Sequence, residues 1–183
     1  MILRGRDNNL RSRSVDVILV MNPQNSFLSP GGSVYMGEQA EILKVRLVDF
    51  LSSCTKPKIF FREKHALEDN FFISDKTHSI ATSEDFQVPD VLKKYADLNI
   101  DKTRYSAFYG TDLEGHLRQK NMQDIGIIGL ETHTSVLFTA EELRNRNFEV
   151  TVIEPCVMSR DDYMHGYAIT LMKHSLGVRV TNG

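Results

Sequence analysis

The sequence predicts an α/β protein with three layers: a Rossmann-like, parallel six-stranded sheet with helices on both faces. Short apolar runs rich in β-branched residues alternate with segments of helical periodicity over residues 15–181. The chain has 183 residues, which is enough for one domain with a substantial core. Strands that alternate with helices at this spacing form parallel sheets with right-handed crossovers. A single domain over residues 15–183 is therefore predicted.

The first elements are predicted from the pattern of apolar residues, which changes from continuous runs to helical spacing and back. Residues 15–21 form a continuous apolar run, typical of a strand buried on both faces. Apolar residues at helical spacing predict a helix over residues 39–54. A second apolar run predicts a strand at residues 58–61. Residues 62–89 are polar and show no clear period, so a long loop over a site is predicted there.

The middle of the chain continues the alternation. Residues 91–95 are predicted as a short helix and residues 98–102 as a third strand. Thr111 with a glutamate three residues later has the pattern of a capping box, which predicts a helix from there to residue 120. The apolar run at residues 124–130 predicts the fourth strand.

The last third supplies the remaining elements. A helix is predicted over residues 135–145, and β-branched residues predict a fifth strand at residues 149–153. The polar run 159–162 predicts the cap of a long helix that ends before Gly177, since glycine commonly ends helices. Residues 178–181 are predicted as the sixth strand.

Composition and charge exclude several classes of function. Hydrophobic residues make up 41% and charged residues 25%, and the net charge of −2 favours neither nucleic acid nor an anionic membrane. No segment approaches the roughly 18 apolar residues of a membrane span, and no signal peptide is visible. Two distant cysteines, Cys54 and Cys156, imply no disulfide framework. A cytoplasmic protein with no nucleic-acid or membrane partner is expected.

Polar side chains follow three of the predicted strands. Ligands bind outside the carboxyl ends of the strands in an open α/β sheet, so a shared site is predicted at this edge. Its candidate residues are Asn22, Gln24 and Asn25 after the first strand, Lys102, Arg104, Tyr105 and Ser106 after the third, and Glu131, Thr132, His133 and Ser135 after the fourth.

Four segments resemble motifs of the isochorismatase-like cysteine hydrolases. Residues 21–27 are similar to D-x-Q-N-D-F, and residues 102–113 to K-x-x-x-S-A-F-x-G-T-x-L. Residues 129–140 are similar to G-x-x-T-x-x-C-V-x-x-T-A, and residues 154–165 to D-A-x-x-S-R-x-x-x-x-H. The resemblance spans the chain in the family's order and implies the isochorismatase-like hydrolase fold.

The resemblance also implies where the chemistry occurs. The family uses an Asp, a Lys and a Cys, whose positions here are Asn22, Lys102 and Ser135. It places a cis peptide bond between Leu130 and Glu131, with oxyanion donors near Thr134 and Ser135. Substrate contacts are expected from Gln24, Phe27 and Tyr105.

Two of the three triad positions are substituted, and this decides the functional prediction. A serine hydroxyl is a weak nucleophile that needs a base, and the Asn22 amide cannot accept a proton as a carboxylate does. The main prediction is a catalytically impaired protein, a pseudoenzyme that binds a small molecule. The alternative is an active hydrolase of small amides or esters, acting on C–N bonds, with Ser135 as nucleophile and Lys102 as its base. Both substitutions are also near-isosteric, so an engineered origin stays open.

Other candidates for chemistry are weighed lower. Cys156 is expected to be a packing residue, and a pairing of His133 with Ser135 across the turn is sterically disfavoured. Nicotinamidases, one branch of the family, have a D-x-H metal motif that resembles residues 63–65, with a further His matched by His78. Glu63, His65 and His78 are thus a speculative metal set, but two surface-loop histidines, no metal and no cofactor are the expectation.

A basic arm is predicted at residues 1–14, where four arginines face a single aspartate. It is either a frayed terminus or a segment that docks on a neighbouring subunit. Family members commonly self-associate, so the resemblance implies at least a dimer. The last long helix offers apolar and aromatic side chains for that interface, namely Tyr163, Met164, Tyr167 and Met172.

Overall fold

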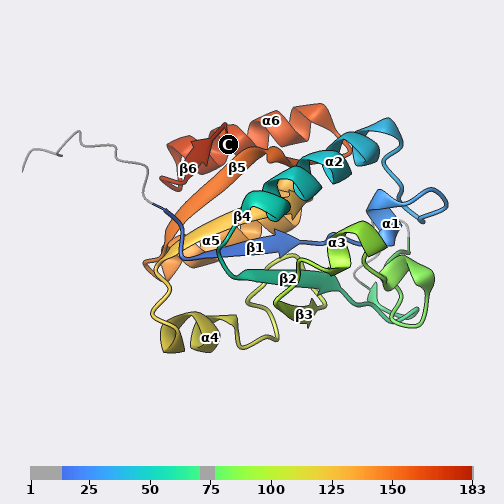
Figure 1. Cartoon of the computed structure of the whole chain (residues 1–183), viewed down its shortest axis with the longest axis horizontal. Helices are drawn as coiled ribbons and strands as arrows, with labels where there is room; N and C mark the ends of the chain where they lie inside the picture. The colour runs from blue at the N-terminus through green and yellow to red at the C-terminus, as the bar shows by residue number, and fades with distance from the viewer. Residues whose placement is uncertain (1–13, 71–76, 183) are drawn as a thin grey trace, which may run out of the picture.

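The computed structural model describes residues 14–70 and 77–182 (Figure 1). Within them, a six-stranded sheet has the order β3-β2-β1-β4-β5-β6, and every neighbouring pair is parallel. The chain order reverses between β1 and β4, which is the switch point where open α/β sheets bind ligands. The strands are β1 (Val17–Met21), β2 (Lys58–Glu63), β3 (Leu98–Lys102), β4 (Asp124–Leu130), β5 (Glu149–Met158) and β6 (Arg179–Thr181).

Helices cover both faces of this sheet (Figure 1). Successive residues of β1 point to opposite faces, so Leu19 joins the apolar cluster beneath α4, α5 and α6, whereas Val20 joins the cluster beneath α2 and α3. The helical elements are α1 (Asn25–Leu28), α2 (Glu38–Ser53), η2 (Glu84–Phe86), α3 (Asp90–Lys93), α4 (Leu113–Gln119), the π-helix η3 (Thr132–Val136), α5 (Leu137–Asn145) and α6 (Asp162–His174). The predicted three-layer α/β class with a parallel six-stranded sheet is confirmed.

Several boundaries differ from the prediction. β2 continues two residues further, to Glu63, and β5 runs on to Met158. The predicted capping box does not form, because the Thr111 hydroxyl donates to the Ala107 carbonyl at 2.5 Å and α4 begins only at Leu113. The cap of α6 is formed by Asp161, whose carboxylate accepts the Met164 N–H at 2.8 Å.

One glycine brings β4 against β1 at the switch point. Gly129 pairs with Met21 and has a φ of +105°, and a Cβ built on it would lie 2.1 Å from the Met21 carbonyl oxygen. Only a residue without a side chain allows this approach. Gly129 therefore fixes how the ends of the two central strands meet.

Some predictions fall outside what the structure describes. Residues 1–13 of the predicted basic arm lie outside the described residues. In the described part of the chain, none of the helices has the length and apolar character needed to span a membrane. The predicted self-association stays a prediction.

Candidate active site

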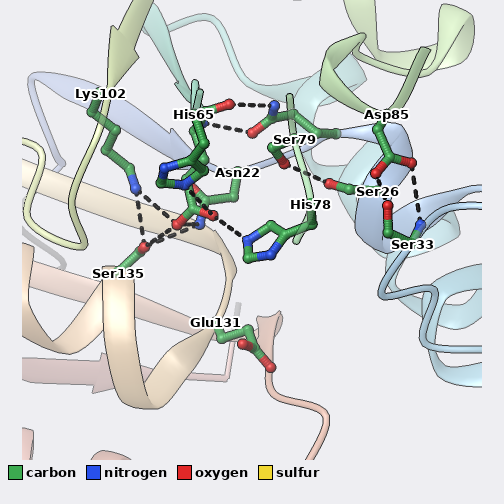
Figure 2. Close-up of polar contacts among 12 residues, drawn as sticks. Asn22, Ser26, Ser33, His65, His78, Ser79, Asp85, Lys102, Glu131 and Ser135 are labelled. Atoms are coloured by element: carbon green, nitrogen blue, oxygen red, sulfur yellow. Dashed lines mark hydrogen bonds and ion pairs between the residues drawn. The ribbon is translucent and has the colours of Figure 1, made fainter. Parts of the chain in front are cut away.

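Buried polar side chains from four segments converge at the carboxyl edge of the sheet (Figure 2). One oxygen of the Glu63 carboxylate, Oε1, is their common acceptor. It receives the Asn22 Nδ2 at 2.8 Å and the Lys102 Nζ at 3.1 Å. The Ser135 hydroxyl donates to the same oxygen at 3.2 Å. The three predicted triad positions do come together, and Glu63 lies among them.

The hydrogen bonds of Ser135 and Lys102 indicate how these groups are protonated. Ser135 Oγ accepts from Asn22 Nδ2 at 3.0 Å and from Lys102 Nζ at 3.1 Å, which fills both of its lone pairs. Its own proton is therefore directed at Glu63. Lys102 Nζ also donates to the Arg104 carbonyl at 3.0 Å. Among the described residues, Lys102 Nζ thus has three acceptors, one for each proton of an ammonium group.

Lys102 and Glu63 form a buried ion pair. Burial lowers the pKa of Lys102, while the charge of Glu63 opposes that shift. Burial alone would raise the pKa of Glu63, but the charge of Lys102, the neighbouring His65 imidazole and the hydrogen bond with His78 hold this pKa well below its usual range. Each charge compensates the desolvation of the other, which favours the ionised carboxylate and the protonated lysine.

The Gln24 side chain holds the backbone of Glu63 in place. Its Nε2 donates to the Glu63 carbonyl at 2.8 Å and to the Phe86 carbonyl at 3.0 Å. Its Oε1 accepts the Glu63 N–H at 2.7 Å. Both amide donors are thus used on backbone groups, and the predicted substrate contact from Gln24 stays a prediction. The side chain clamps the end of β2.

The other two predicted substrate residues have different surroundings. Phe27 is buried in the core, and its ring meets the His78 ring edge-on at a centroid distance of 5.3 Å. Tyr105 stacks on Phe138 at 5.7 Å and lines a cavity of about 230 Å³ beside Arg104. Tyr105 borders this cavity, and its contact with a substrate stays a prediction.

The two histidines of the speculative metal set are not on the surface. His65 and His78 are 2% and 5% exposed, so the expectation of surface-loop histidines is wrong. The cause is a short parallel bridge between His65 and Ile80, which holds residues 78–81 beside the end of β2. The sequence could not predict this bridge, because residues 62–89 have no period.

Both imidazoles face the second carboxylate oxygen of Glu63. Glu63 Oε2 lies 3.0 Å from His78 Nε2 and 3.8 Å from His65 Nε2. The possible ligand atoms of these three residues lie within 4.8 Å of one another. Asp69 Oδ2 lies 3.3 Å from His65 Nδ1. A carboxylate in such a position commonly orients a histidine that binds a metal ion.

This donor set fits a divalent cation in number and type. One carboxylate and two imidazoles suit zinc, iron or manganese. Glu63, His65 and His78 would hold the ion, which would supply a Lewis acid that polarises a carbonyl or activates water. The remaining oxygen of Glu63 stays with Lys102 and Ser135 in the present geometry.

The turn before Ser135 has the geometry that the resemblance implies in one respect. The Leu130–Glu131 peptide bond is cis. The Glu131 carboxylate points away from the Ser135 cluster (Figure 2) and accepts the Arg160 Nε and Nη2 at 3.0 Å each. The Thr134 N–H, a predicted oxyanion donor, is already hydrogen-bonded to the Glu131 carbonyl at 3.2 Å. Its role toward a substrate stays a prediction.

His133 does not pair with the serine at the nucleophile position. Its Nδ1 lies 2.9 Å from the hydroxyl of Ser159, at the end of β5. The sequence-based expectation against a His133–Ser135 pair agrees with this geometry.

Cys156 is unsuited as a replacement nucleophile. It is 4% exposed within the apolar cluster beneath α2, and burial raises the pKa of its thiol to about 11. At neutral pH the reactive thiolate is therefore scarce. We expect iodoacetamide at pH 7.5 to alkylate the half-buried Cys54 and to leave Cys156 unmodified, as measured by peptide mass spectrometry. Unfolding in guanidinium should expose both thiols equally. Equal labelling in the folded protein would contradict the assignment.

The chain resembles proteins of known family and structure. The protein-family model of the isochorismatase domain matches residues 16–182. A Bacillus subtilis protein named as the uncharacterized isochorismatase family protein PncA is 37% identical over 81 residues, which are 44% of each chain. The alignment thus spans less than half the length of this curated relative.

Solved structures cover the chain more fully. The nicotinamidase/pyrazinamidase PncA of Bacillus subtilis is 27% identical, with a TM-score of 0.82 over 91% of this chain and 98% of its own. The N-carbamoylsarcosine amidase of Thermoplasma acidophilum is 25% identical, with a TM-score of 0.77 over 90% of this chain and 94% of its own. The sheet order, the matched domain and these similarities agree. The chain belongs to the isochorismatase family and has its hydrolase fold.

Proposed function

We propose that the protein hydrolyses a small amide or ester with Ser135 as its nucleophile. One observation carries this proposal: the Ser135 hydroxyl is directed at a buried, ionised carboxylate and is held there by Lys102. The prediction of catalytic impairment rests on two substitutions, namely the weaker nucleophile at Ser135 and the lack of a proton acceptor at Asn22. Glu63 is such an acceptor, so the active alternative has the better geometric support.

A second observation favours an amide over an ester as substrate. The Oδ1 atom of Asn22 is buried and has no hydrogen-bond partner among the described residues. A buried polar atom is costly unless it is paired. The N–H of a bound amide would satisfy this acceptor, whereas an ester has no equivalent donor. The similar structures named as nicotinamidase and as an amidase support the same substrate class.

Acylation by p-nitrophenyl acetate tests the nucleophile directly. We expect a burst of p-nitrophenol and an acetyl group on Ser135, detected by peptide mass spectrometry. Ser135→Ala should lower the rate by about 10³-fold or more, because it removes the attacking oxygen. Ser52→Ala, a change at an exposed serine on α2, should leave the rate unchanged.

The outcome separates the two functional predictions. An acetylated Ser135, with ammonia released from a panel of primary amides, supports a hydrolase. An unmodified Ser135 together with amide binding, measured by calorimetry, would instead support the impaired, small-molecule-binding protein.

A further inference from the structure

We propose that Glu63 is the catalytic base of this site. The proton acceptor then lies at the end of β2, whereas the resemblance places it at the end of β1. This inference rests on the proposed function above. The resemblance assigns the base to position 22, where an amide stands, and the sequence-based alternative assigns it to Lys102. The resemblance assigns Glu63 only to a possible metal set.

The hydrogen bonds distinguish Glu63 from Lys102 as the base. A base must accept the serine proton, so the serine must donate to it. Lys102 Nζ donates at 3.1 Å to Ser135 Oγ, and its other protons are directed at Glu63 and at a backbone carbonyl. Glu63 Oε1 can only accept, and it lies 3.2 Å from the same hydroxyl. The proton of Ser135 therefore has a path to Glu63.

The length of the glutamate side chain explains how it reaches the serine. The related motif after the second strand has an aspartate at this position, which is one methylene shorter. In Glu63 the two oxygens are divided between neighbours: Oε2 faces His78 at 3.0 Å, and Oε1 faces Ser135. The Gln24 clamp on the backbone of Glu63 fixes the base of the side chain. The carboxylate is thus held from both ends.

The proposed step balances as a two-stage acyl transfer. Ser135 Oγ forms a bond to the substrate carbonyl carbon while its proton passes to Glu63 Oε1, and the carbonyl electrons move to the oxygen. Collapse of this adduct breaks the bond to the amine or alcohol, which leaves with the proton from Glu63. Water then attacks the acyl-serine and gives a proton to Glu63, which returns it to Ser135 as the acid leaves.

Lys102 and Asn22 have positioning roles in this step. Lys102 donates to both reacting oxygens, Ser135 Oγ and Glu63 Oε1, so it holds them together and stabilises the negative charge that passes between them. Asn22 donates to the same two atoms through Nδ2. Position 22 holds the catalytic acid in the family. Here it holds the Asn22 amide, which donates to Glu63 and orients it as the proposed base.

The test compares Glu63→Gln with the unmodified protein. Burst kinetics with p-nitrophenyl acetate should show that the variant acylates Ser135 about 10²-fold more slowly or worse, because general-base catalysis contributes on that order. Circular dichroism and thermal unfolding test whether the variant is folded. Glu149→Gln, which removes a carboxylate from the opposite edge of the sheet, should acylate at the unmodified rate.

Two further variants exclude a merely structural role. Formate should accelerate Glu63→Ala by replacing the missing carboxylate, and it should not accelerate the unmodified protein. Asn22→Asp combined with Glu63→Gln returns a carboxylate to the end of β1 and should recover most of the lost rate. Neither recovery is expected if Glu63 only packs or binds a metal.

The results distinguish this inference from the proposed function. If the unmodified protein never acylates Ser135, the proposed function fails. If it acylates Ser135 and Glu63→Gln does so equally fast, the function stands and the assignment of Glu63 is overturned. A His78→Ala variant as slow as Glu63→Gln, with both restored by added zinc, would also overturn the assignment in favour of a metal-dependent step.

Discussion

Replacing Gly129 with alanine is expected to lower the free energy of unfolding by about 3–5 kcal/mol, the range of large single-residue effects. The added methyl group would lie 2.1 Å from the carbonyl oxygen and 2.7 Å from the nitrogen of Met21, both of which are backbone atoms of the central strand. Neither can rotate away as a flexible side chain would. The φ of +105° adds strain for any residue with a Cβ.

Urea titration followed by circular dichroism measures this effect. The matched control is Gly166→Ala in α6, where an added Cβ meets no atom within 4 Å. That change should raise stability by about 0.5–1 kcal/mol, because glycine is a poor residue inside a helix. A Gly129→Ala variant as stable as the unmodified protein would show that β1 and β4 can separate without cost.

Replacing Lys102 with methionine is expected to cost about 3–5 kcal/mol of stability, as is usual when one partner of a buried ion pair is removed. Methionine retains the length and apolar stem of lysine, so the loss reports on charge. Glu63 would lose its buried counter-charge, although it would keep contacts with Asn22 and His78. The carboxylate would then be desolvated without compensation.

A double-mutant cycle isolates the contribution of this pair. Adding Glu63→Gln to Lys102→Met removes the uncompensated charge and should restore most of the stability lost in the single variant. Denaturant unfolding of the four proteins gives the coupling free energy. Losses that simply add would contradict a direct Lys102–Glu63 interaction. Stability is the readout, since both residues belong to the active site.

The fold could be predicted because its signals are local. The apolar run 15–21 contains β1, which begins at Val17, and the alternation of strands and helices was sufficient to predict a parallel three-layer sheet. Element ends were less predictable. The predicted second strand stops at Phe61, since Arg62 and Glu63 are charged, but β2 pairs with β3 through Glu63 and Lys102. Because the predicted strand ended at Phe61, the sequence did not place Glu63 at the strand end beside Ser135.

The site could be predicted in outline but not in its hydrogen bonds. Motif spacing placed Asn22, Lys102 and Ser135 at one edge, and they do meet there. The sequence could not indicate that Gln24 would direct its amide to the backbone, because an amide after a strand is equally suited to bind a ligand. It also could not place His78, whose position depends on a bridge within a segment without periodicity.

The 2.8 Å contact between Asn22 and Glu63 makes the side chains at the two positions dependent on each other. An aspartate at position 22 would set a second carboxylate against Glu63, and two such groups at this distance cannot both ionise readily. An Asn22→Asp substitution is therefore disfavoured while Glu63 remains. The amide at position 22 and the glutamate at position 63 are therefore matched, so a substitution at one of them changes the electrostatic surroundings of the other.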